Sequence, residues 1–192
     1  MSNTNLPTNL NDVDWSTLPR PEDDGAGERV EGFAVPTLPL PATDDTNIDL
    51  SAPGRTVVFV YPMTGTPDVA LPDGWDGIPG ARGCTPQACA FRNLHDDLIA
   101  AGADRVFGLS TQTVEDQKEA AERLHLPYPL LSDNGLLFAD ALGLPRFAIG
   151  EAAYLKRMTL VIEDSFVKKV FYPVFPPDRA AADVLNWLRE TP

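Results

Sequence analysis

Continuous apolar runs alternate with amphipathic segments through the middle of the chain. Residues 56–61 form an unbroken β-branched and aromatic run, which predicts a strand buried on both faces. Residues 105–110 repeat this pattern, and a shorter strand is expected at 128–132. Between these strands, apolar residues at helical spacing predict helices over 85–101 and 114–124. Strand and helix therefore alternate, as in a sheet that is covered by helices.

The last third of the chain adds a hairpin and a closing helix. A short helix is expected at 136–142, followed by strands at 158–163 and 166–172. The Asp-Ser pair at 164–165 separates these two strands and is a hairpin signal. A final helix over 178–190 has an apolar face. The whole pattern predicts an α/β fold, a three-layer sandwich with a mixed central sheet.

Two segments of the chain depart from this regular pattern, one at its start and one inside the domain. Residues 1–30 are rich in Asn, Asp, Pro and Gly and predict an irregular extension without regular elements, in which Trp15 is a candidate for docking on the domain. The domain is expected to span 31–192, with edge strands or a hairpin within 31–50. A long Gly/Pro-rich loop at 63–83 interrupts it, and loops of this length are usually functional.

Composition and charge narrow the possible roles. The chain has 192 residues, of which 43% are hydrophobic, and a formal net charge of −13. Such a charge repels phosphate backbones and anionic lipids, so nucleic-acid and membrane partners are not expected. The apolar stretch at 56–62 is too short to span a bilayer. The polar first residues contain no Lys or Arg and resemble no signal peptide, so a cytoplasmic location is expected.

The two cysteines are the candidates for chemistry. Cys84 follows a buried strand and a glycine-bearing loop and stands at the start of a helix. At such a position, backbone N–H groups and the helix dipole favour an anion. A thiol at such a position readily forms the nucleophilic thiolate. The alternative is a buried, inert cysteine. Two Cys and two His at 84, 89, 95 and 125 match no usual zinc spacing, and neither a metal nor a cofactor is expected.

Cys89 follows Cys84 by five residues within the same predicted helix. In an ideal α-helix such residues have Cα atoms about 8.6 Å apart, beyond the limit of about 7 Å for a disulfide. A bridge therefore requires the first turns to unwind, and Pro86 already weakens their hydrogen bonding. The pair is interpreted as a redox switch, and the alternative is that Cys89 is a core residue.

Three arginines could support a thiolate in this acidic chain. Arg82 precedes Cys84 by two residues, Arg92 follows it by eight, and Arg157 begins a later strand. A guanidinium stabilises a thiolate and can bind peroxide oxygens as negative charge develops. From spacing alone, a surface position is the alternative for each of them.

Two segments around Cys84 resemble a known family. YPMTGTP at 61–67 and GCTPQACAFR at 83–92 are similar to the active-site segment of Q-type peroxiredoxins, also called bacterioferritin comigratory proteins, of the AhpC/TSA-like redoxin superfamily. That segment typically reads Y-P-x-x-x-T-P-G-C-T-x-Q-A-C-x-F-R-D. The likeness covers roughly residues 31–190 and continues at 106–110, 126–133 and 157–163.

The resemblance implies a thioredoxin-like fold and a role for each matching residue. Cys84 would be the peroxidatic cysteine and Cys89 the resolving one. Thr66 would supply a hydroxyl near the thiolate, Pro62 would shield it from water, and Arg157 would help to fix the peroxide. Gln87 and Arg92 also match motif positions, without an assigned role.

The implied activity is the thiol-dependent reduction of hydrogen peroxide and organic hydroperoxides. Cys84 would become a sulfenic acid, Cys89 would condense with it, and thioredoxin or a similar dithiol would reduce the disulfide. A monomer or weak dimer is expected. The alternatives are a protein thiol–disulfide oxidoreductase or peroxide sensor of the same fold, and a binding protein with incidental thiols. The absence of a C-x-x-C pair counts against general disulfide exchange.

The chain departs from the family pattern just before Cys84. The motif threonine normally stands three residues before the peroxidatic cysteine, but Thr66 and Cys84 are eighteen apart. Fifteen residues, 68–82, are therefore inserted, and Thr66 keeps its role only if this insert loops out and returns. Apolar residues such as Trp75 would let the insert fold back on the domain or meet a partner, and Arg82 at its end could supplement or compete with Arg157.

Overall fold

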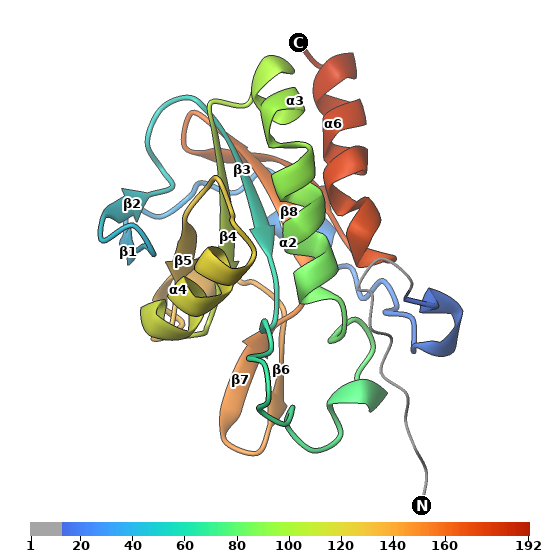
Figure 1. The fold of residues 1–192 in the computed structure, drawn as a ribbon. Helices are drawn as coiled ribbons and strands as arrows, with labels where there is room; N and C mark the ends of the chain where they lie inside the picture. The colour runs from blue at the N-terminus through green and yellow to red at the C-terminus, as the bar shows by residue number, and fades with distance from the viewer. Residues whose placement is uncertain (1–12) are drawn as a thin grey trace, which may run out of the picture.

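A mixed five-stranded sheet forms the centre of the computed structural model, which describes residues 13–192 (Figure 1). The strands lie in the order β5–β4–β3–β8–β9. Their bounds are Arg55–Val60 for β3, Arg105–Ser110 for β4, Leu130–Ser132 for β5, Met158–Glu163 for β8 and Phe166–Phe171 for β9. β3, β4 and β5 run parallel, whereas β8 pairs antiparallel with both β3 and β9.

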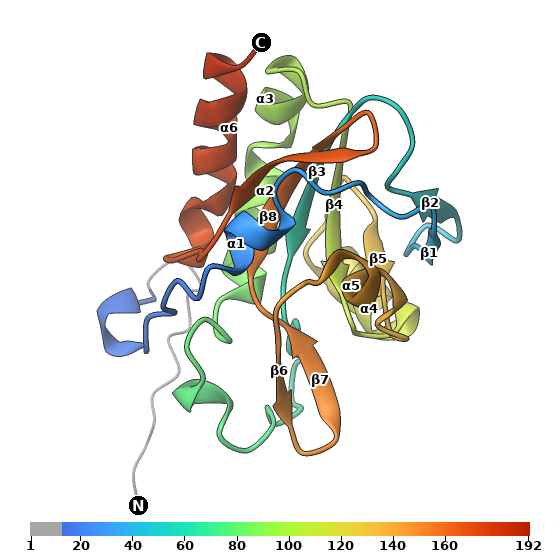
Figure 2. The ribbon, with the colours of Figure 1, turned by 180° about the vertical axis from the view of Figure 1, so that it is seen from behind.

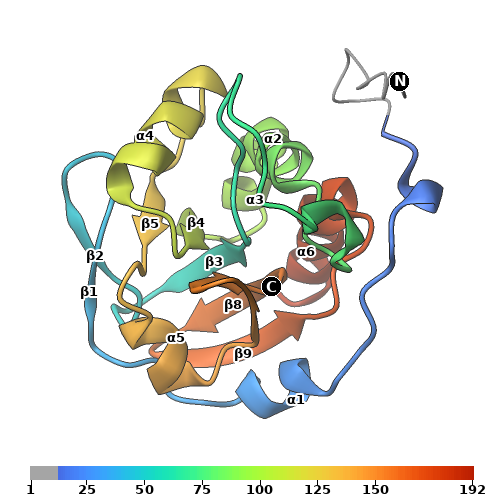
Figure 3. The same ribbon diagram turned by 90° about the horizontal axis from the view of Figure 1, so that it is seen from below.

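Helices cover both faces of this sheet, with α2, α3, α4 and α6 on one side and α1 and α5 on the other (Figures 2 and 3). Their bounds are Ala26–Val30 for α1, Cys84–Asn93 for α2, His95–Ala100 for α3, Val114–Arg123 for α4, Leu137–Leu142 for α5 and Ala180–Glu190 for α6. The predicted three-layer α/β sandwich is therefore confirmed. Within residues 13–192, every helix is too short or too polar to cross a membrane.

The continuous apolar run of β3 supplies both layers of the core. Because successive strand residues point to opposite faces, Val57 and Phe59 pack beneath α2 and α6, whereas Val58 and Val60 pack against α5. All four side chains are fully buried. This two-sided burial explains why the strand lacks the alternation of apolar and polar residues that a half-exposed strand shows.

Two antiparallel hairpins lie outside the main sheet. The first, β1 (Pro39–Pro41) with β2 (Asn47–Asp49), confirms the hairpin expected near residues 31–50. The second, β6 (Arg146–Ile149) with β7 (Ala152–Leu155), is not predicted by the sequence. Its side chains are mostly half-exposed, so no clear periodicity marks it.

One predicted helix is divided. The segment expected as a single helix over 85–101 bends at Leu94, whose backbone has φ −105° and ψ 10°, and becomes α2 and α3. Hydrogen bonds from Leu94 N–H to the Ala90 carbonyl and from Leu98 N–H to the Leu94 carbonyl continue across the bend. The chain therefore changes direction at this residue, with one backbone hydrogen bond on each side of the bend.

The extension is more ordered than expected in the part that the structure describes. A short 3₁₀ helix, η1 (Trp15–Thr17), and the helix α1 both fall within residues 1–30, so the prediction of no regular element is wrong there. Ala26 and Val30 are buried, and Val30 joins the core between the sheet and α5. Part of this predicted extension, 1–12, lies outside the described residues, and the domain boundary at 30 stays a prediction.

An aromatic group fixes α2 on the sheet. Phe91 of α2 stacks on Phe59 of β3 with ring centroids 4.5 Å apart, and Tyr128 meets Phe59 edge-on at 5.6 Å. Gly108 of β4 permits this close packing, because a Cβ at that position would lie 2.7 Å from Phe59 Cζ and 2.5 Å from Leu130 Cδ2.

Gly108→Ala is therefore expected to lower the free energy of unfolding by about 1–3 kcal/mol, the usual range for overpacking a core. Urea unfolding followed by circular dichroism measures the change. Gly77→Ala is the matched control, because a Cβ at Gly77 meets nothing within 4 Å. Equal stability of the two variants would contradict the packing argument.

Candidate active site

Cys84 is the first residue of α2, directly after a glycine that the fold requires. Gly83 has φ +103°, and a Cβ there would lie 2.5 Å from Pro177 Cγ and 3.0 Å from Trp15 Cη2. Glycine therefore permits both the turn and the close approach of two other segments. Cys84 is 5% exposed and lies where the unpaired N–H groups of a helix start favour negative charge.

The Cys84 sulfur has two polar neighbours. Arg157 Nη2 lies 3.2 Å from Sγ and donates to it. The thiol itself donates to the Ala81 carbonyl oxygen at 3.6 Å. A guanidinium within hydrogen-bond distance can stabilise negative charge on a sulfur atom. The predicted proximity of Cys84 and Arg157 is thus observed, although 73 positions separate them in the chain.

Arg157 precedes β8 and connects several parts of the site. It is 3% exposed, and its Nη2 lies 3.1, 3.3 and 3.1 Å from the carbonyl oxygens of Gly80, Ala81 and Arg82. Its Nη1 donates to Oε1 of Gln87, a fully buried residue of α2. The guanidinium is therefore held by the end of the insert and by α2, and its orientation toward the sulfur is fixed.

Cys89 lies in the same helix as Cys84, and both cysteines are free. Because α2 is helical through both residues, their Cα atoms are about 8.6 Å apart by ideal geometry. A disulfide therefore requires α2 to unwind locally. The Tyr128 hydroxyl donates to the Ala88 carbonyl at 2.6 Å and holds the helix between the cysteines.

Two buried tyrosines near the cysteines stay protonated. Burial, followed by the negative charge of Cys84, raises the pKa of Tyr61 well above its usual value. The Tyr61 hydroxyl donates to Gln117 Oε1 at 2.7 Å. Burial, followed by the charge of Cys89, likewise raises the pKa of Tyr128. Neither phenol can therefore serve as a base at neutral pH, and both act as hydrogen-bond donors.

Thr66 and Pro62 are not joined to Cys84 by the contacts described. Thr66 is exposed, and Pro62 is buried with its carbonyl accepting a bond from the Ser110 hydroxyl at 3.0 Å. Within residues 13–192, neither side chain hydrogen-bonds to Cys84 or lines the cavity beside it. Thr64 is buried instead, and its hydroxyl lies 3.1 Å from Gln112 Oε1. Among the described residues, the polar contacts of the sulfur therefore do not include the motif threonine.

The insert folds back on the domain. Trp75 is 3% exposed and packs against Phe147 and Tyr154 of the β6–β7 hairpin, with centroid distances of 5.8 and 5.1 Å. Asp76 binds the Arg82 guanidinium through contacts of 2.5 and 3.0 Å. This hydrogen bond from Arg82 holds the pKa of Asp76 below its usual value.

The three candidate arginines therefore have different surroundings. Arg157 bonds to Cys84, whereas the Arg82 side chain is held by Asp76. Arg92 donates to the Leu124 carbonyl at the end of α4, at 2.7 Å, and thereby supports the packing of the helices. Among these three arginines, the recorded contacts to the sulfur come from Arg157.

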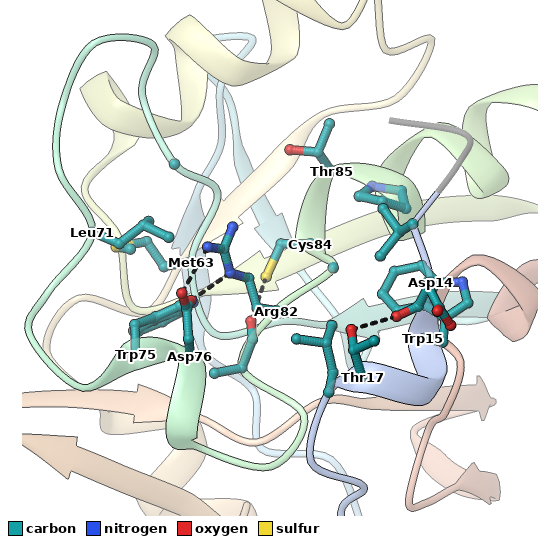
Figure 4. A pocket seen from close by; sticks show the side chains of 16 residues that line it. Asp14, Trp15, Thr17, Met63, Leu71, Trp75, Asp76, Arg82, Cys84 and Thr85 are labelled. Atoms are coloured by element: carbon teal, nitrogen blue, oxygen red, sulfur yellow. Dashed lines mark hydrogen bonds and ion pairs between the residues drawn. The ribbon is translucent and has the colours of Figure 1, made fainter. Parts of the chain in front are cut away.

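A cavity of about 560 Å³ opens beside Cys84 (Figure 4). Residues of the extension lie on one side of Cys84 and residues of the insert on the other. The lining consists of Val13, Asp14, Trp15, Thr17, Leu18, Met63, Gly65, Leu71, Trp75, Asp76, Ala81, Arg82, Gly83, Cys84, Thr85 and Pro86. The sequence predicts that Trp15 docks on the domain, but it does not predict that Trp15 lines a cavity beside Cys84.

Comparison with known proteins identifies the family. The Redoxin family model matches residues 26–186. A putative peroxiredoxin of Mycobacterium tuberculosis is 35% identical over 162 residues, which cover 82% of this chain and 95% of the relative. A chloroplastic peroxiredoxin Q of Suaeda salsa is 32% identical over 162 residues, which cover 83% of this chain and 67% of the relative.

Solved structures show the same fold. The peroxidoxin BcpB of Mycobacterium tuberculosis has a TM-score of 0.69 and 32% identity, covering 84% of this chain and 97% of that one. A peroxiredoxin Q of Xanthomonas campestris has a TM-score of 0.64 at 22% identity, covering 80% and 90%, and supports the fold alone. The predicted thioredoxin-like fold is thereby confirmed. The chain belongs to the redoxin family, as a thiol peroxidase of the peroxiredoxin Q type.

Proposed function

We propose that Cys84 is the peroxidatic cysteine and that it reduces hydrogen peroxide and organic hydroperoxides. The observation that carries this assignment is the 3.2 Å contact between Arg157 Nη2 and the Cys84 sulfur. The sulfur also lies at the start of α2 and beside a cavity. The nucleophilic sulfur therefore has a cation and space for a substrate directly beside it.

The first step is a displacement at oxygen. The Cys84 thiolate attacks the terminal oxygen of the hydroperoxide, the S–O bond forms and the O–O bond breaks. The leaving oxygen takes the electron pair and a proton and departs as water or an alcohol, while Cys84 becomes a sulfenic acid. Arg157 stabilises the charge that develops on the oxygens, and Gln87 positions its guanidinium.

Cys89 completes the cycle in this proposal. Its thiolate attacks the Cys84 sulfur, a disulfide forms, and the sulfenic oxygen leaves as water after it takes up a proton. The helical spacing of the two cysteines makes local unwinding of α2 part of this step. Thioredoxin or a similar dithiol then reduces the disulfide.

The remaining parts of the proposal come from the sequence. The roles of Thr66 and Pro62 rest on the motif alone. A monomer or weak dimer as the active form stays a prediction. The cytoplasmic location inferred from the first residues stays a prediction.

The alternative is a peroxide sensor or protein thiol–disulfide oxidoreductase of the same fold. One observation favours the sensor: α2 holds the two cysteines apart, so a slowly unwinding helix would prolong the life of the sulfenic acid. The two roles differ in the fate of Cys84 after oxidation, since a sensor passes its oxidation to another protein.

Cys84→Ser is expected to lose essentially all peroxide turnover, because the nucleophile is removed. Cys89→Ser is expected to react once with peroxide and to accumulate the sulfenic acid, because the resolving thiol is absent. Mass spectrometry after one equivalent of hydrogen peroxide should map a Cys84–Cys89 disulfide in the wild type. Full turnover by Cys84→Ser would refute the assignment, and stable overoxidation of wild-type Cys84 would point to a one-cysteine cycle.

Arg157→Gln is expected to reduce kcat/KM for hydrogen peroxide by about 10²–10³, the range for loss of one donor to a developing oxyanion. Arg82→Gln is the matched comparison, because its guanidinium is held by Asp76 instead of the sulfur. We expect it to reduce kcat/KM less than tenfold. Stopped-flow measurement of peroxide consumption tests both variants, and a larger effect of Arg82→Gln would reverse the assignment of the two arginines.

A further inference from the structure

The cavity beside Cys84 has walls that the family motif does not account for. One wall comes from the extension, through Trp15 and Leu18, and the other from the insert, through Leu71 and Trp75 (Figure 4). Its volume of about 560 Å³ far exceeds the space that hydrogen peroxide needs, given that one water occupies about 30 Å³ in the liquid. The cavity therefore has room for an organic group attached to the peroxide.

Both walls are fixed by contacts outside the cavity. Trp15 Nε1 donates to Asp178 at 3.0 Å, and the indole packs edge-on against Phe175 with centroids 6.3 Å apart. Further along the extension, Asp24 accepts a hydrogen bond from Lys156 at 2.8 Å, which lowers the pKa of Asp24 to about 2. This carboxylate is therefore ionised at neutral pH, and the ion pair joins the extension to the segment before β8. Trp75 is held by the β6–β7 hairpin.

The charge of the lining discriminates among organic groups. Two carboxylates, Asp14 and Asp76, and one guanidinium, Arg82, line the cavity. Arg82 is paired with Asp76, and Arg157 is paired with the Cys84 thiolate in the proposed reaction. Among residues 13–192, this leaves Asp14 as the unpaired charge in the lining. Hydrogen bonds from Ser16 hold the pKa of Asp14 below its usual value, so it is ionised at neutral pH. The cavity therefore carries a net negative charge and disfavours an anionic tail.

We propose that this cavity binds the apolar group of uncharged organic hydroperoxides, and that Trp15 and Asp14 determine the specificity. This inference rests on the proposed role of Cys84 and names its substrate class. Trp15 provides apolar contact for an aromatic or branched group, and Asp14 selects against a carboxylate on that group. The terminal peroxide oxygen lies toward Cys84, and the alcohol formed when the O–O bond breaks leaves through the same opening.

The test of Trp15 compares kcat/KM for cumene hydroperoxide with kcat/KM for hydrogen peroxide. Trp15→Ala is expected to lower the ratio of kcat/KM for cumene hydroperoxide to kcat/KM for hydrogen peroxide about tenfold. The reason is that the aromatic ring of cumene hydroperoxide loses one wall of its pocket. Phe33→Ala is the control, since Phe33 is an aromatic residue that is 56% exposed and does not line the cavity. The control should leave the ratio unchanged. A ratio in Trp15→Ala equal to that of the wild type would overturn the role of Trp15.

The test of Asp14 compares cumene hydroperoxide with its ring-carboxylated analogue, which has a similar shape and a negative charge. The wild type is expected to prefer the neutral compound about fivefold at low ionic strength, the effect of about one surface charge. Asp14→Asn or added salt should bring this preference close to one. Asp97→Asn is the control, because it removes an exposed carboxylate of α3 that does not line the cavity. Equal preferences in Asp14→Asn and the wild type would overturn the charge selection.

The outcomes separate this inference from the proposed function. If the wild type reduces none of the three hydroperoxides, the assignment of Cys84 fails. If it reduces hydrogen peroxide but does not distinguish among the organic compounds or the variants, only the specificity inference fails. Circular dichroism of each variant checks its folding, and the Asp14 test keeps the inference open to refutation if Trp15→Ala does not fold.

Discussion

The contact between Arg157 and Cys84 is the interaction on which the rest of the site depends. Arg157 directly precedes β8, which lies between β3 and β9 in the sheet, whereas Cys84 begins α2, which packs on the face of that sheet. The guanidinium can reach the sulfur only if the strand, the helix and the end of the insert keep their relative positions. The stacking of Phe59 on Phe91 maintains that relation between sheet and helix. Core packing and chemistry are therefore coupled through a few side chains.

The two cysteines impose an opposite demand. In the proposed cycle, attack on a peroxide uses the intact helix start at Cys84, whereas a bond to Cys89 requires that turn to unwind. Contacts that stabilise the helical form, such as the bond from Tyr128 to the Ala88 carbonyl, therefore favour the first step and oppose the second. The balance between reaction with peroxide and formation of the disulfide therefore depends on the stability of α2.

Sequence patterns predicted most of the fold because its buried strands and helices leave runs or periodic rows of apolar residues in the sequence. β4 and β8 begin and end where the apolar runs at 105–110 and 158–163 do. The β6–β7 hairpin was missed because its half-exposed residues carry no periodic signal. In the site, the motif identified Cys84 and Arg157, but the carbonyl groups at 80–82 could not be foreseen, since every residue carries a carbonyl. Only the path of the chain brings those atoms to the guanidinium.

The insert changes the electrostatics of the sulfur as well as the shape of the cavity. Thr66 is exposed just before the insert, and the insert's Ala81 carbonyl lies 3.6 Å from the Cys84 sulfur. Ionisation of Cys84 removes the proton that joins these two atoms and leaves a negative sulfur facing a carbonyl oxygen. Arg157 Nη2 lies within 3.3 Å of both atoms and can offset their repulsion. A hydroxyl in the place of the Ala81 carbonyl could donate a hydrogen bond to the thiolate, whereas the carbonyl oxygen cannot. The insert therefore makes the site depend more strongly on Arg157.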